Sequence, residues 1–387
     1  MKLAVHAGTL RGAGSQAVGR ATITALAGLG HELLTWVPES WPALDLPPTR
    51  VRRLGPGMRR KLELEALALP REAARFGARA LLSLTDTSCP AACLRLAHLG
   101  QAQLGKLGQA QLDKLGQAQL PHVLMVQQAY LAYPASSLGF PRPRRFHAKM
   151  RLMAAYFELG LAGVTQFVVQ TSDMRAQLAA RWGIEPSRIT VIPSSVSPAV
   201  LRARAERPIT SPAGLLCVTS EAPHKGHRFL PGLLERLREL EPSAARLAIT
   251  LQRGAVRSFD LAIAERGLAD RVDYLGSLEH TALLECLRRA GVVVIPSELE
   301  SFGIPYYEAL ALGVPVVALD RGFAREACGG AGRYGRTASE LAEHALALLT
   351  DPALRAQQSE ASRARFQAVH HSWEDIAQRY TDLIQAS

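Results

Sequence analysis

The chain has few cysteines and no long apolar run. Its 387 residues contain five cysteines, Cys89, Cys93, Cys217, Cys286 and Cys328. They are too few and too scattered for a disulfide framework or a zinc site, so we expect reduced thiols. No apolar run approaches the roughly 18 to 20 residues that cross a bilayer, and the start, MKLAVHAG, has too short an apolar core for a signal peptide. We therefore expect a globular protein that is made and kept in the cytoplasm.

The basic residues are not accompanied by the other sequence features of nucleic-acid-binding proteins. The net charge is +11, and two basic clusters stand out, one from Arg50 to Lys61 and one from Arg142 to Arg151. Neither cluster has the interleaved aromatic residues of a single-strand nucleic-acid groove, and no nucleic-acid motif accompanies them, so we expect no nucleic-acid partner. Two interpretations stay open for these clusters. They are either ordinary solvated arginines or a face that contacts anionic lipid headgroups at the inner face of the membrane.

The most informative stretch of the sequence is residues 291–317, GVVVIPSELESFGIPYYEALALGVPVV. An apolar run comes first, followed by a polar turn that carries Glu298 and Glu300. The segment YYEALAL then predicts a helix, and a β-branched run after Gly313 predicts a second strand. A strand, loop, helix and strand in this order favour a buried parallel sheet.

The loop in this unit has the features of a ligand site. Ligands of parallel sheets bind outside the carboxyl ends of the strands, and here that end carries two carboxylates and a glycine just before a helix. The N–H groups near Gly303 and Ile304 would face an anion with the helix dipole behind them. Carboxylates accept hydrogen bonds from sugar and ribose hydroxyls. The layout therefore predicts a phosphorylated, hydroxyl-rich ligand.

Glu300 and Glu308 are separated by the seven residues SFGIPYY, and the string continues as ALALGVPVV. This string resembles the E-x7-E signature of retaining GT-B glycosyltransferases, in particular the large family four. The resemblance implies an α/β GT-B fold, with two facing Rossmann-like domains and a deep interdomain cleft. It also implies sugar transfer, with retention, from a nucleotide-diphosphate sugar of the UDP or GDP type to a lipid-linked or glycan hydroxyl. No cofactor is implied, and no Asp-x-Asp motif sits in a suitable loop for a metal. The implied role is in cell-envelope or polysaccharide biosynthesis.

The same resemblance assigns donor-side roles to the second half of the chain. Lys225 and the N–H groups of Gly303 and Ile304 would stabilise the departing diphosphate. Glu300 would fix the donor sugar as a catalytic residue, and Glu308 would bind the ribose. The other candidates for donor binding are Ser220, Gly276, Leu278, Ser301 and Phe302.

The sequence departs from the family pattern in three places. Ser220 stands where relatives usually have an arginine, with Arg228 and Arg253 as candidate substitutes. The usual Gly-x-Gly after the next strand is replaced by TLQRGA. Gln127, the second catalytic candidate, stands where relatives often have a histidine, and glutamine cannot titrate. Two alternatives therefore stay open: a same-fold sugar-nucleotide epimerase, and a divergent, non-catalytic sugar-nucleotide-binding protein.

We expect three parts in the chain. Residues 1–200 form an acceptor-side domain, whose glycine-rich loop with Gly12 and Gly14 would face the acceptor. This part contains residues 99–122, in which an eight-residue unit occurs three times as LGQAQLGK, LGQAQLDK and LGQAQLPH. We expect this insert to protrude without catalytic residues. Residues 201–366 form the nucleotide-sugar-binding domain after a linker at about 197–212, and residues 367–387 form a helix that crosses back.

Overall fold

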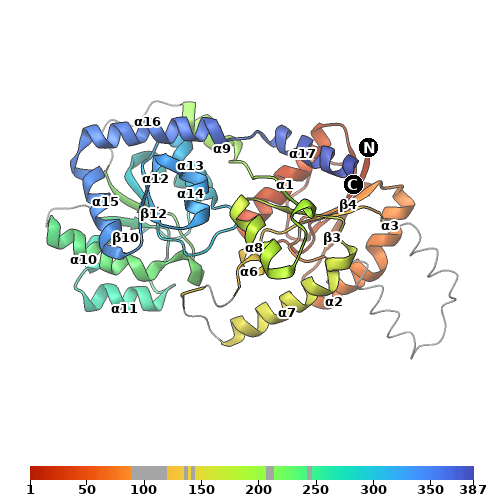
Figure 1. Ribbon diagram of the computed structural model, residues 1–387, viewed down its shortest axis with the longest axis horizontal. Coiled ribbons are helices and arrows are strands. Elements are labelled where there is room, and N and C mark those ends of the chain that lie inside the picture. The colour runs from red at the N-terminus through yellow and green to blue at the C-terminus, as the bar shows by residue number, and fades with distance from the viewer. Residues whose placement is uncertain (89–119, 135–137, 141–143, 206–212, 242–245) are drawn as a thin grey trace. The chain divides into compact units, whose positions relative to one another are not determined.

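The computed structural model describes residues 1–88, 120–134, 138–140, 144–205, 213–241 and 246–387. The chain divides into two compact units (Figure 1). The first unit comprises Met1–Ala135, Pro143–Ser194 and His371–Ser387, and the second comprises Ser136–Arg142 and Ser195–His370. The predicted insert at residues 99–122 lies outside the described residues, apart from its last three positions.

The first unit is built on a seven-stranded parallel sheet in the order β3-β2-β1-β4-β5-β6-β7. Its strands are β1 (Lys2–His6), β2 (Glu32–Pro38), β3 (Val51–Leu54), β4 (Ala80–Ser83), β5 (His122–Met125), β6 (Gln166–Val169) and β7 (Ile189–Val191). The inner strands β4 and β5 are buried along their whole length. Burial on both faces explains why these strands appear in the sequence as continuous apolar runs rather than alternating ones.

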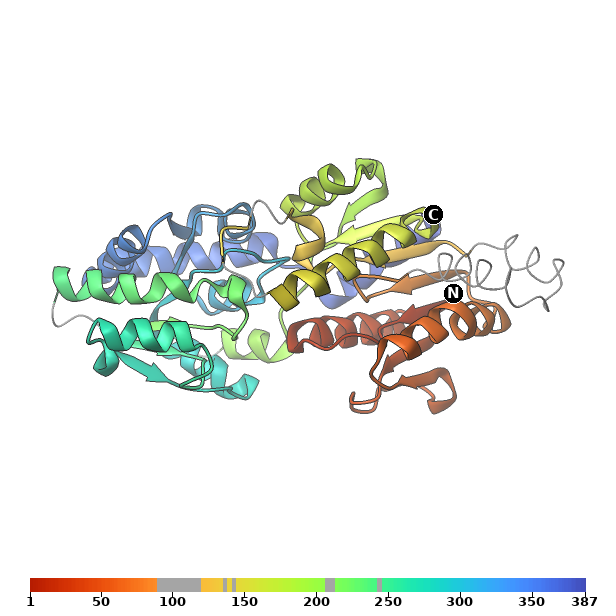
Figure 2. The same cartoon turned by 90° about the horizontal axis from the view of Figure 1, so that it is seen from below.

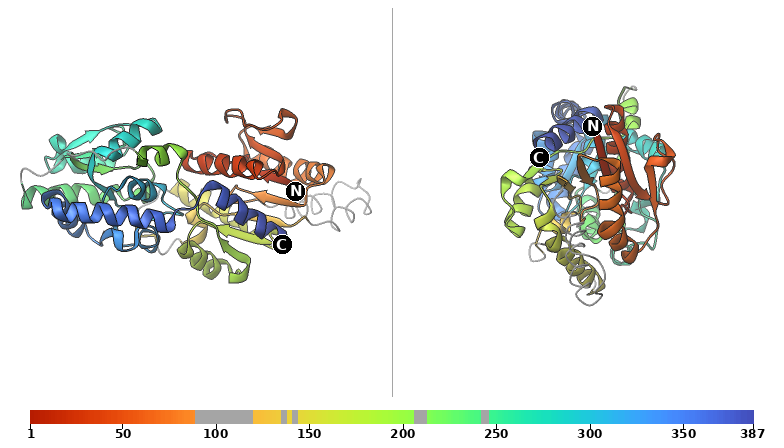
Figure 3. Two further views of the ribbon diagram at one scale, coloured as in Figure 1. Left: turned by 90° about the horizontal axis from the view of Figure 1, so that it is seen from above. Right: turned by 90° about the vertical axis from the view of Figure 1, so that its right-hand side faces the viewer.

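Helices accompany this sheet along the chain. They are α1 (Ala13–Gly28), α2 (Met58–Glu63), α3 (Leu69–Phe76), α6 (Ala129–Ala132), α7 (Arg144–Gly160), α8 (Ser172–Trp182) and α17 (Trp373–Ala386), with a π-helix at Leu64–Ala68 and 3₁₀ turns at Pro48–Arg50, Leu161–Gly163 and Pro186–Arg188. The C-terminal helix α17 lies beside α1, as Figure 3 shows. The hydroxyl of Tyr380 donates to the sulfur of Met125 at 3.2 Å, which ties α17 to the end of β5.

The second unit is built on a six-stranded parallel sheet in the order β10-β9-β8-β11-β12-β13. Its strands are β8 (Ala213–Cys217), β9 (Leu247–Ile249), β10 (Val272–Tyr274), β11 (Ala290–Ile295), β12 (Val316–Leu319) and β13 (Gly332–Gly335). Its helices are α9 (Pro198–Ala205), α10 (Leu230–Leu240), α11 (Arg257–Glu265), α12 (His280–Arg289), α13 (Ile304–Leu312), α14 (Gly322–Cys328), α15 (Ala338–Thr350) and α16 (Pro352–Val369), with 3₁₀ turns at Pro223–Lys225, His227–Phe229, Ala269–Arg271 and Gly329–Ala331. Helices α10 and α11 lie side by side (Figure 2).

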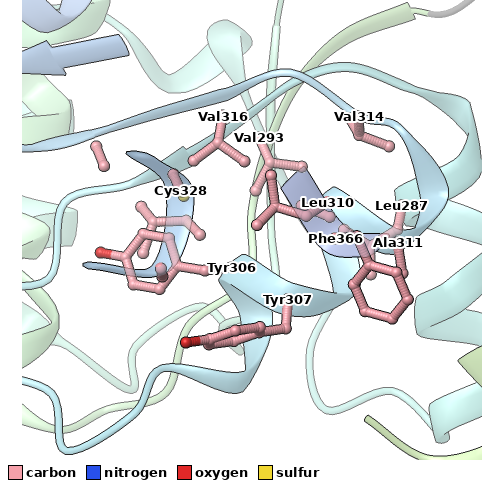
Figure 4. Close-up of a cluster of buried hydrophobic side chains, with 14 of the residues drawn as sticks. Leu287, Val293, Tyr306, Tyr307, Leu310, Ala311, Val314, Val316, Cys328 and Phe366 are labelled. Carbon is pink, nitrogen blue, oxygen red and sulfur yellow. The ribbon is translucent and has the colours of Figure 1, made fainter. Parts of the chain in front are cut away.

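Helix α13 lies at the centre of the largest core of this unit. Figure 4 shows Tyr306, Leu310 and Ala311 of α13 together with the valines of β11 and β12 and with Phe366 of α16. Six of the nine residues of α13 are buried, including the charged Glu308. A helix that is apolar on all sides is a buried helix, so the segment YYEALAL is held by tertiary packing rather than by an amphipathic face.

Two local expectations from the sequence are wrong. Residues 198–205, expected as part of a linker, form α9, because Val200 is fully buried in the core of the second unit. Helix α1 begins at Ala13, so Gly14 lies in its first turn and not in the preceding loop.

The strand orders fix where ligands can be expected. The direction of winding reverses between β1 and β4 in the first sheet and between β8 and β11 in the second. A crevice forms at such a switch point, outside the carboxyl ends of the two strands, and open α/β sheets bind their ligands there. The residues that follow β8 and β11 therefore form the expected ligand site of the second unit. In the part of the chain that the structure describes, no helix is long and apolar enough to cross a membrane.

Candidate functional site

The loops after β8 and β11 meet at the switch point of the second sheet. The loop after β8 carries His224, Lys225 and Gly226, and the carbonyl of His224 accepts a hydrogen bond from the N–H of Glu298 at 2.7 Å. Gly226 has a φ of +71°, and a side chain there would overlap the carbonyl oxygen of Pro296. The position requires glycine for its conformation and for this close approach. Both constraints hold Lys225 against the loop after β11.

Lys225 and Glu300, two residues predicted for the donor side, form an ion pair. Lys225 Nζ lies 2.7 Å from Glu300 Oε1, and the side chains are 17% and 11% exposed. Burial by itself would raise the pKa of the Glu300 carboxyl, but the positive charge of Lys225 lowers it below its ordinary value. Glu300 is therefore ionised and ready to accept hydrogen bonds at neutral pH. The ammonium group has three donors, so it can keep Glu300 and still reach a ligand oxygen.

A second ion pair lies in the same two loops. Arg228 donates to both carboxylate oxygens of Glu298, at 2.9 and 2.6 Å. This bidentate geometry is the strong form of an arginine–carboxylate contact. The guanidinium of Arg228 is thus already engaged by Glu298, although half of its side chain is exposed. The other candidate substitute cation, Arg253, lies over the ring of Tyr274 with 4.7 Å to the centroid.

The start of α13 presents backbone N–H groups at this edge. Gly303 caps the helix with a φ of +80°, and a Cβ on it would meet the ring of Tyr306. Phe302 stacks on Tyr307 with 4.1 Å between the ring centroids and is 2% exposed. Phe302 therefore can contact a ligand only through its backbone. Pro305 has no N–H and that of Tyr306 donates to the carbonyl of Gly303, so the N–H groups of Gly303 and Ile304 form the candidate anion site.

A pocket of about 520 Å³ lies beside these groups on the side of β9 and β10. Its walls come from the residues that follow β8, β9 and β10 and from α12: Val218, Thr219, Ser220, Glu221, Ala222, Thr250, Leu251, Gln252, Ser277, Leu278 and Leu283. Two of the predicted donor residues, Ser220 and Leu278, line it. Gly276 does not line it but forms the left-handed turn, φ +69°, that brings Ser277 and Leu278 to the pocket.

Glu308, the second glutamate of the E-x7-E string, binds a histidine. Its Oε1 lies 2.8 Å from His280 Nε2 at the start of α12. The carboxylate is 6% exposed and the imidazole is 40% exposed. This hydrogen bond, together with the charge of Glu308, raises the pKa of His280 above its ordinary value.

The other histidines near the site are neutral at physiological pH. Burial lowers the pKa of His224 and of His227 to about 4 in each case. His227 Nε2 lies 3.0 Å from the hydroxyl of Thr219, a pocket residue. The positive charge at this edge therefore comes from Lys225 and not from these imidazoles.

The first unit holds the acceptor-side candidates. Gln127 follows β5, and its N–H donates to Asp86 Oδ1 at 2.6 Å while its side-chain amide donates to the carbonyl of Leu84 at 3.2 Å. Gly12 and Gly14 have room for a side chain, and neither has a positive φ. The backbone therefore does not require glycine at these two positions. Their role in the close approach of a ligand stays a prediction.

The basic cluster from Arg50 to Lys61 is largely paired. Arg50, Arg52 and Arg59 each lie within 2.9 Å of a glutamate oxygen. Lys61 is 7% exposed and donates to the carbonyl of Thr87 at 2.6 Å. Lys61 therefore cannot belong to a membrane-facing surface. Part of the cluster from Arg142 to Arg151 lies outside the described residues.

Sequence reasoning assigned no role to several residues that the fold brings to these edges. His280 and Asp86 are the most prominent, and a buried network also joins His6, Glu65 and Tyr156 at the end of β1. In that network Glu65 accepts from His6 Nε2 at 3.0 Å and from the Tyr156 hydroxyl at 2.5 Å. Isolated polar residues of this kind belong to no motif with a defined spacing, so only the tertiary structure reveals that they lie together.

The architecture is that of known GT-B glycosyltransferases. Sucrose-phosphate synthase from Thermosynechococcus elongatus superimposes over the whole of both chains with a TM-score of 0.70 and 19% identity. An α,α-trehalose-phosphate synthase from Burkholderia vietnamiensis does so with a TM-score of 0.69 and 14% identity. The predicted GT-B fold of two Rossmann-like domains is thereby confirmed, while the cleft between them stays a prediction.

Sequence comparison finds a family match within the second unit. Residues 203–365 match the family model described as glycosyl transferases group 1. Glycogen synthase of Mycobacterium tuberculosis is 31% identical over 212 residues, which are 54% of this chain and 50% of that protein. A GDP-mannose-dependent phosphatidylinositol monomannoside mannosyltransferase of Corynebacterium glutamicum is 30% identical over 182 residues, 44% of this chain and 47% of that protein. The matches thus span about half the length of these relatives.

Proposed function

We propose that this protein is a glycosyltransferase that moves a sugar from a nucleotide-diphosphate sugar to an acceptor hydroxyl. One observation carries the proposal: a pocket, the Lys225–Glu300 pair and the N-terminus of α13 adjoin at the switch point of the second sheet. This edge offers separate places for a base, a diphosphate and a sugar. The relatives named above are sugar-transferring enzymes, which supports the same conclusion.

In this proposal each part of the donor has its own partner. The base occupies the pocket beside Ser220 and Leu278, and the ribose hydroxyls donate to Glu308. The diphosphate lies against Lys225 and the first N–H groups of α13, where opposite charge is greatest. The donor sugar donates hydroxyl hydrogen bonds to the ionised Glu300.

The charge of the leaving diphosphate grows as the glycosidic bond breaks. Fixed donors that point at that charge lower the barrier, and Lys225 and the helix N-terminus supply such donors without a divalent ion. We further propose that the anomeric configuration is retained and that the leaving phosphate accepts the acceptor proton. The acceptor would lie at the carboxyl edge of the first sheet, near Gly12, Gly14 and Gln127, and would be a lipid-linked or glycan hydroxyl.

The test is a thermal-shift panel with UDP, GDP, ADP and their sugar conjugates on the wild type and on Glu308→Ala. A ligand at about 100 times its Kd adds about 2.7 kcal/mol to the folded state. We expect one nucleotide family to stabilise the wild type and to lose that effect in Glu308→Ala. The exposed Glu343 of α15 provides the matched control, since Glu343→Ala should keep the full shift. If none of these ligands shifted the unfolding temperature of the folded wild type, the proposal would be refuted.

The two alternatives predict different product formation. An epimerase would interconvert sugar nucleotides without an acceptor, whereas a transferase releases the nucleoside diphosphate in proportion to the acceptor. A non-catalytic binding protein would show the thermal shift and release nothing. Measuring nucleotide release with and without a panel of glycan and lipid-linked acceptors distinguishes the three.

A further inference from the structure

Glu308 has one carboxylate oxygen bound and one available. Oε1 is 2.8 Å from His280 Nε2, whereas Oε2 accepts no hydrogen bond from the residues that the structure describes. The side chain comes from the buried helix α13, which fixes its Cα and limits its rotamers. An ionised carboxylate is an acceptor only, so a ligand hydroxyl is a suitable partner for Oε2.

His280 links this carboxylate to the wall of the pocket. It is the first residue of α12, and Leu283, three residues later on the same helix, lines the pocket. Residues three apart share a helix face, so the imidazole and Leu283 lie on the same side of α12. The other ring nitrogen, Nδ1, lies 3.5 Å from the hydroxyl of Ser197. The ring is thus flanked by Glu308 on one side and Ser197 on the other.

We propose that His280 is a positioning residue: it fixes the Glu308 carboxylate so that Oε2 receives the ribose hydroxyls of a nucleotide whose base fills the pocket. This inference rests on the proposed function, because it names a further residue of the same donor site. His280 acts through Glu308, in the way that an outer partner orients a metal ligand. Without His280 the carboxylate would lose one fixed partner and sample other orientations.

The charged groups around His280 make its contact with Glu308 dependent on pH. Strands β8 and β11, which pack on α12, contribute no charged residue, and Cys217 of β8 is a buried thiol whose pKa burial raises; α13 contributes Glu308. On α9, Arg204 lies over the ring of Phe366 and Arg202 is exposed. Glu279, next to His280 in the chain, is exposed. Farther along α12, Glu285 pairs with Arg288 and Arg289. Glu308 raises the pKa of His280, so the imidazolium persists above the ordinary range. Above that pKa the neutral ring can carry its proton on Nδ1, which leaves no donor for Glu308.

Isothermal titration of UDP and GDP, each compared with its 2′,3′-dideoxy form, tests the inference on the wild type, His280→Ala and His280→Gln. We expect His280→Ala to weaken the preferred ribonucleotide about five- to tenfold and to leave its dideoxy form unchanged. His280→Gln keeps a neutral donor and should recover most of the affinity. The wild-type Kd should rise between pH 6 and pH 9, whereas the Kd of His280→Gln should stay flat. Because the imidazole is 40% exposed, we expect both variants to fold, and far-UV circular dichroism checks this.

Other outcomes overturn the inference in separable ways. Equal weakening of the ribo- and dideoxynucleotides in His280→Ala would mean general damage to the pocket, and unchanged affinity would mean no role for His280. Equal binding of the ribo- and dideoxynucleotides by the wild type would refute the ribose contact, and with it this inference, but not nucleotide binding. Absence of any nucleotide binding by the wild type would refute the proposed function and this inference together.

Discussion

Asp86 has a setting that differs from that of an ordinary carboxylate. It follows β4 at the switch point of the first sheet, and it has a φ of +50°, a conformation that aspartate tolerates better than most residues. Burial raises the pKa of Asp86 to about 6, although the N–H groups of Gln127 and Gln128 and the charge of Lys61 act in the opposite direction. Asp86 therefore places a titratable group beside Gln127, which cannot titrate.

This raised pKa predicts a loss of stability with rising pH. Between pH 4 and pH 6 the folded protein holds a proton on Asp86 that the unfolded chain has released, so the free energy of unfolding falls as the pH rises. The rise from 3.8 to about 6 corresponds to a loss on the order of 3 kcal/mol at 1.36 kcal/mol per unit. Asp86→Asn keeps an acceptor for Gln127 and should remove this dependence. Urea unfolding at pH 4, 5, 6 and 7 measures the difference.

The exposed Asp45 is the control for this prediction, because Asp45→Asn should leave the wild-type pH dependence unchanged. All four tryptophans, Trp36, Trp41, Trp182 and Trp373, belong to the first unit, so their fluorescence follows the unit that contains Asp86. Parallel curves for the wild type and Asp86→Asn over this range would contradict the prediction.

At the scale of elements, the loop from β8 to α10 depends on one glycine. Gly226→Ala must adopt a left-handed conformation, which costs roughly 1 to 2 kcal/mol, and its Cβ must displace the backbone at Pro296. We expect a total loss of about 3 kcal/mol or more in the second unit. Gly267 is the matched control: it has a φ of +61°, and no atom lies within 4 Å of the place that a Cβ would take, so Gly267→Ala should cost only the conformational part.

Two probes measure this loss in one experiment. Circular dichroism follows both units, whereas tryptophan fluorescence follows the first unit only. In Gly226→Ala we expect the dichroism to fall at lower urea concentration while the fluorescence transition stays in place. Equal costs for Gly226→Ala and Gly267→Ala would show that the contact with Pro296 is not a constraint.

The same elements explain what the sequence could and could not predict. Strands such as β5 and β11 are buried along their length, so their apolar runs predicted the parallel sheets, and the fold class is confirmed. The Lys225–Glu300 ion pair could not be predicted from the sequence, because the two residues are 75 positions apart and no local pattern couples them. Asp86 was missed for a related reason: its pKa is a product of burial, which a single aspartate in a loop does not reveal.

At the scale of the whole molecule, the chain ends in the unit where it began. After α16 completes the second unit, residues 371–387 return to the first, where α17 buries Ile376, Tyr380 and Ile384 against it. Burying an apolar side chain of this size contributes about 1.5 to 3 kcal/mol, so these three contribute a sum comparable to the stability of a domain. The first unit is therefore complete only with residues 371–387 in place.

A chain that stops after His370 should accordingly keep a folded second unit and lose cooperative unfolding of the first. A milder change tests the same point without removing Trp373: Ile376→Ala, at a side chain that is 1% exposed, should cost about 2 to 5 kcal/mol. The matched control is the exposed Gln378 on the same helix, where substitution by alanine should change stability by less than about 0.5 kcal/mol. Tryptophan fluorescence during urea unfolding reports on the first unit, and hydrogen exchange at β8 and β11 reports on the second. If exchange at β8 and β11 accelerated as much as exchange at β1 and β5, α17 would be stabilising the molecule as one unit rather than the first unit alone.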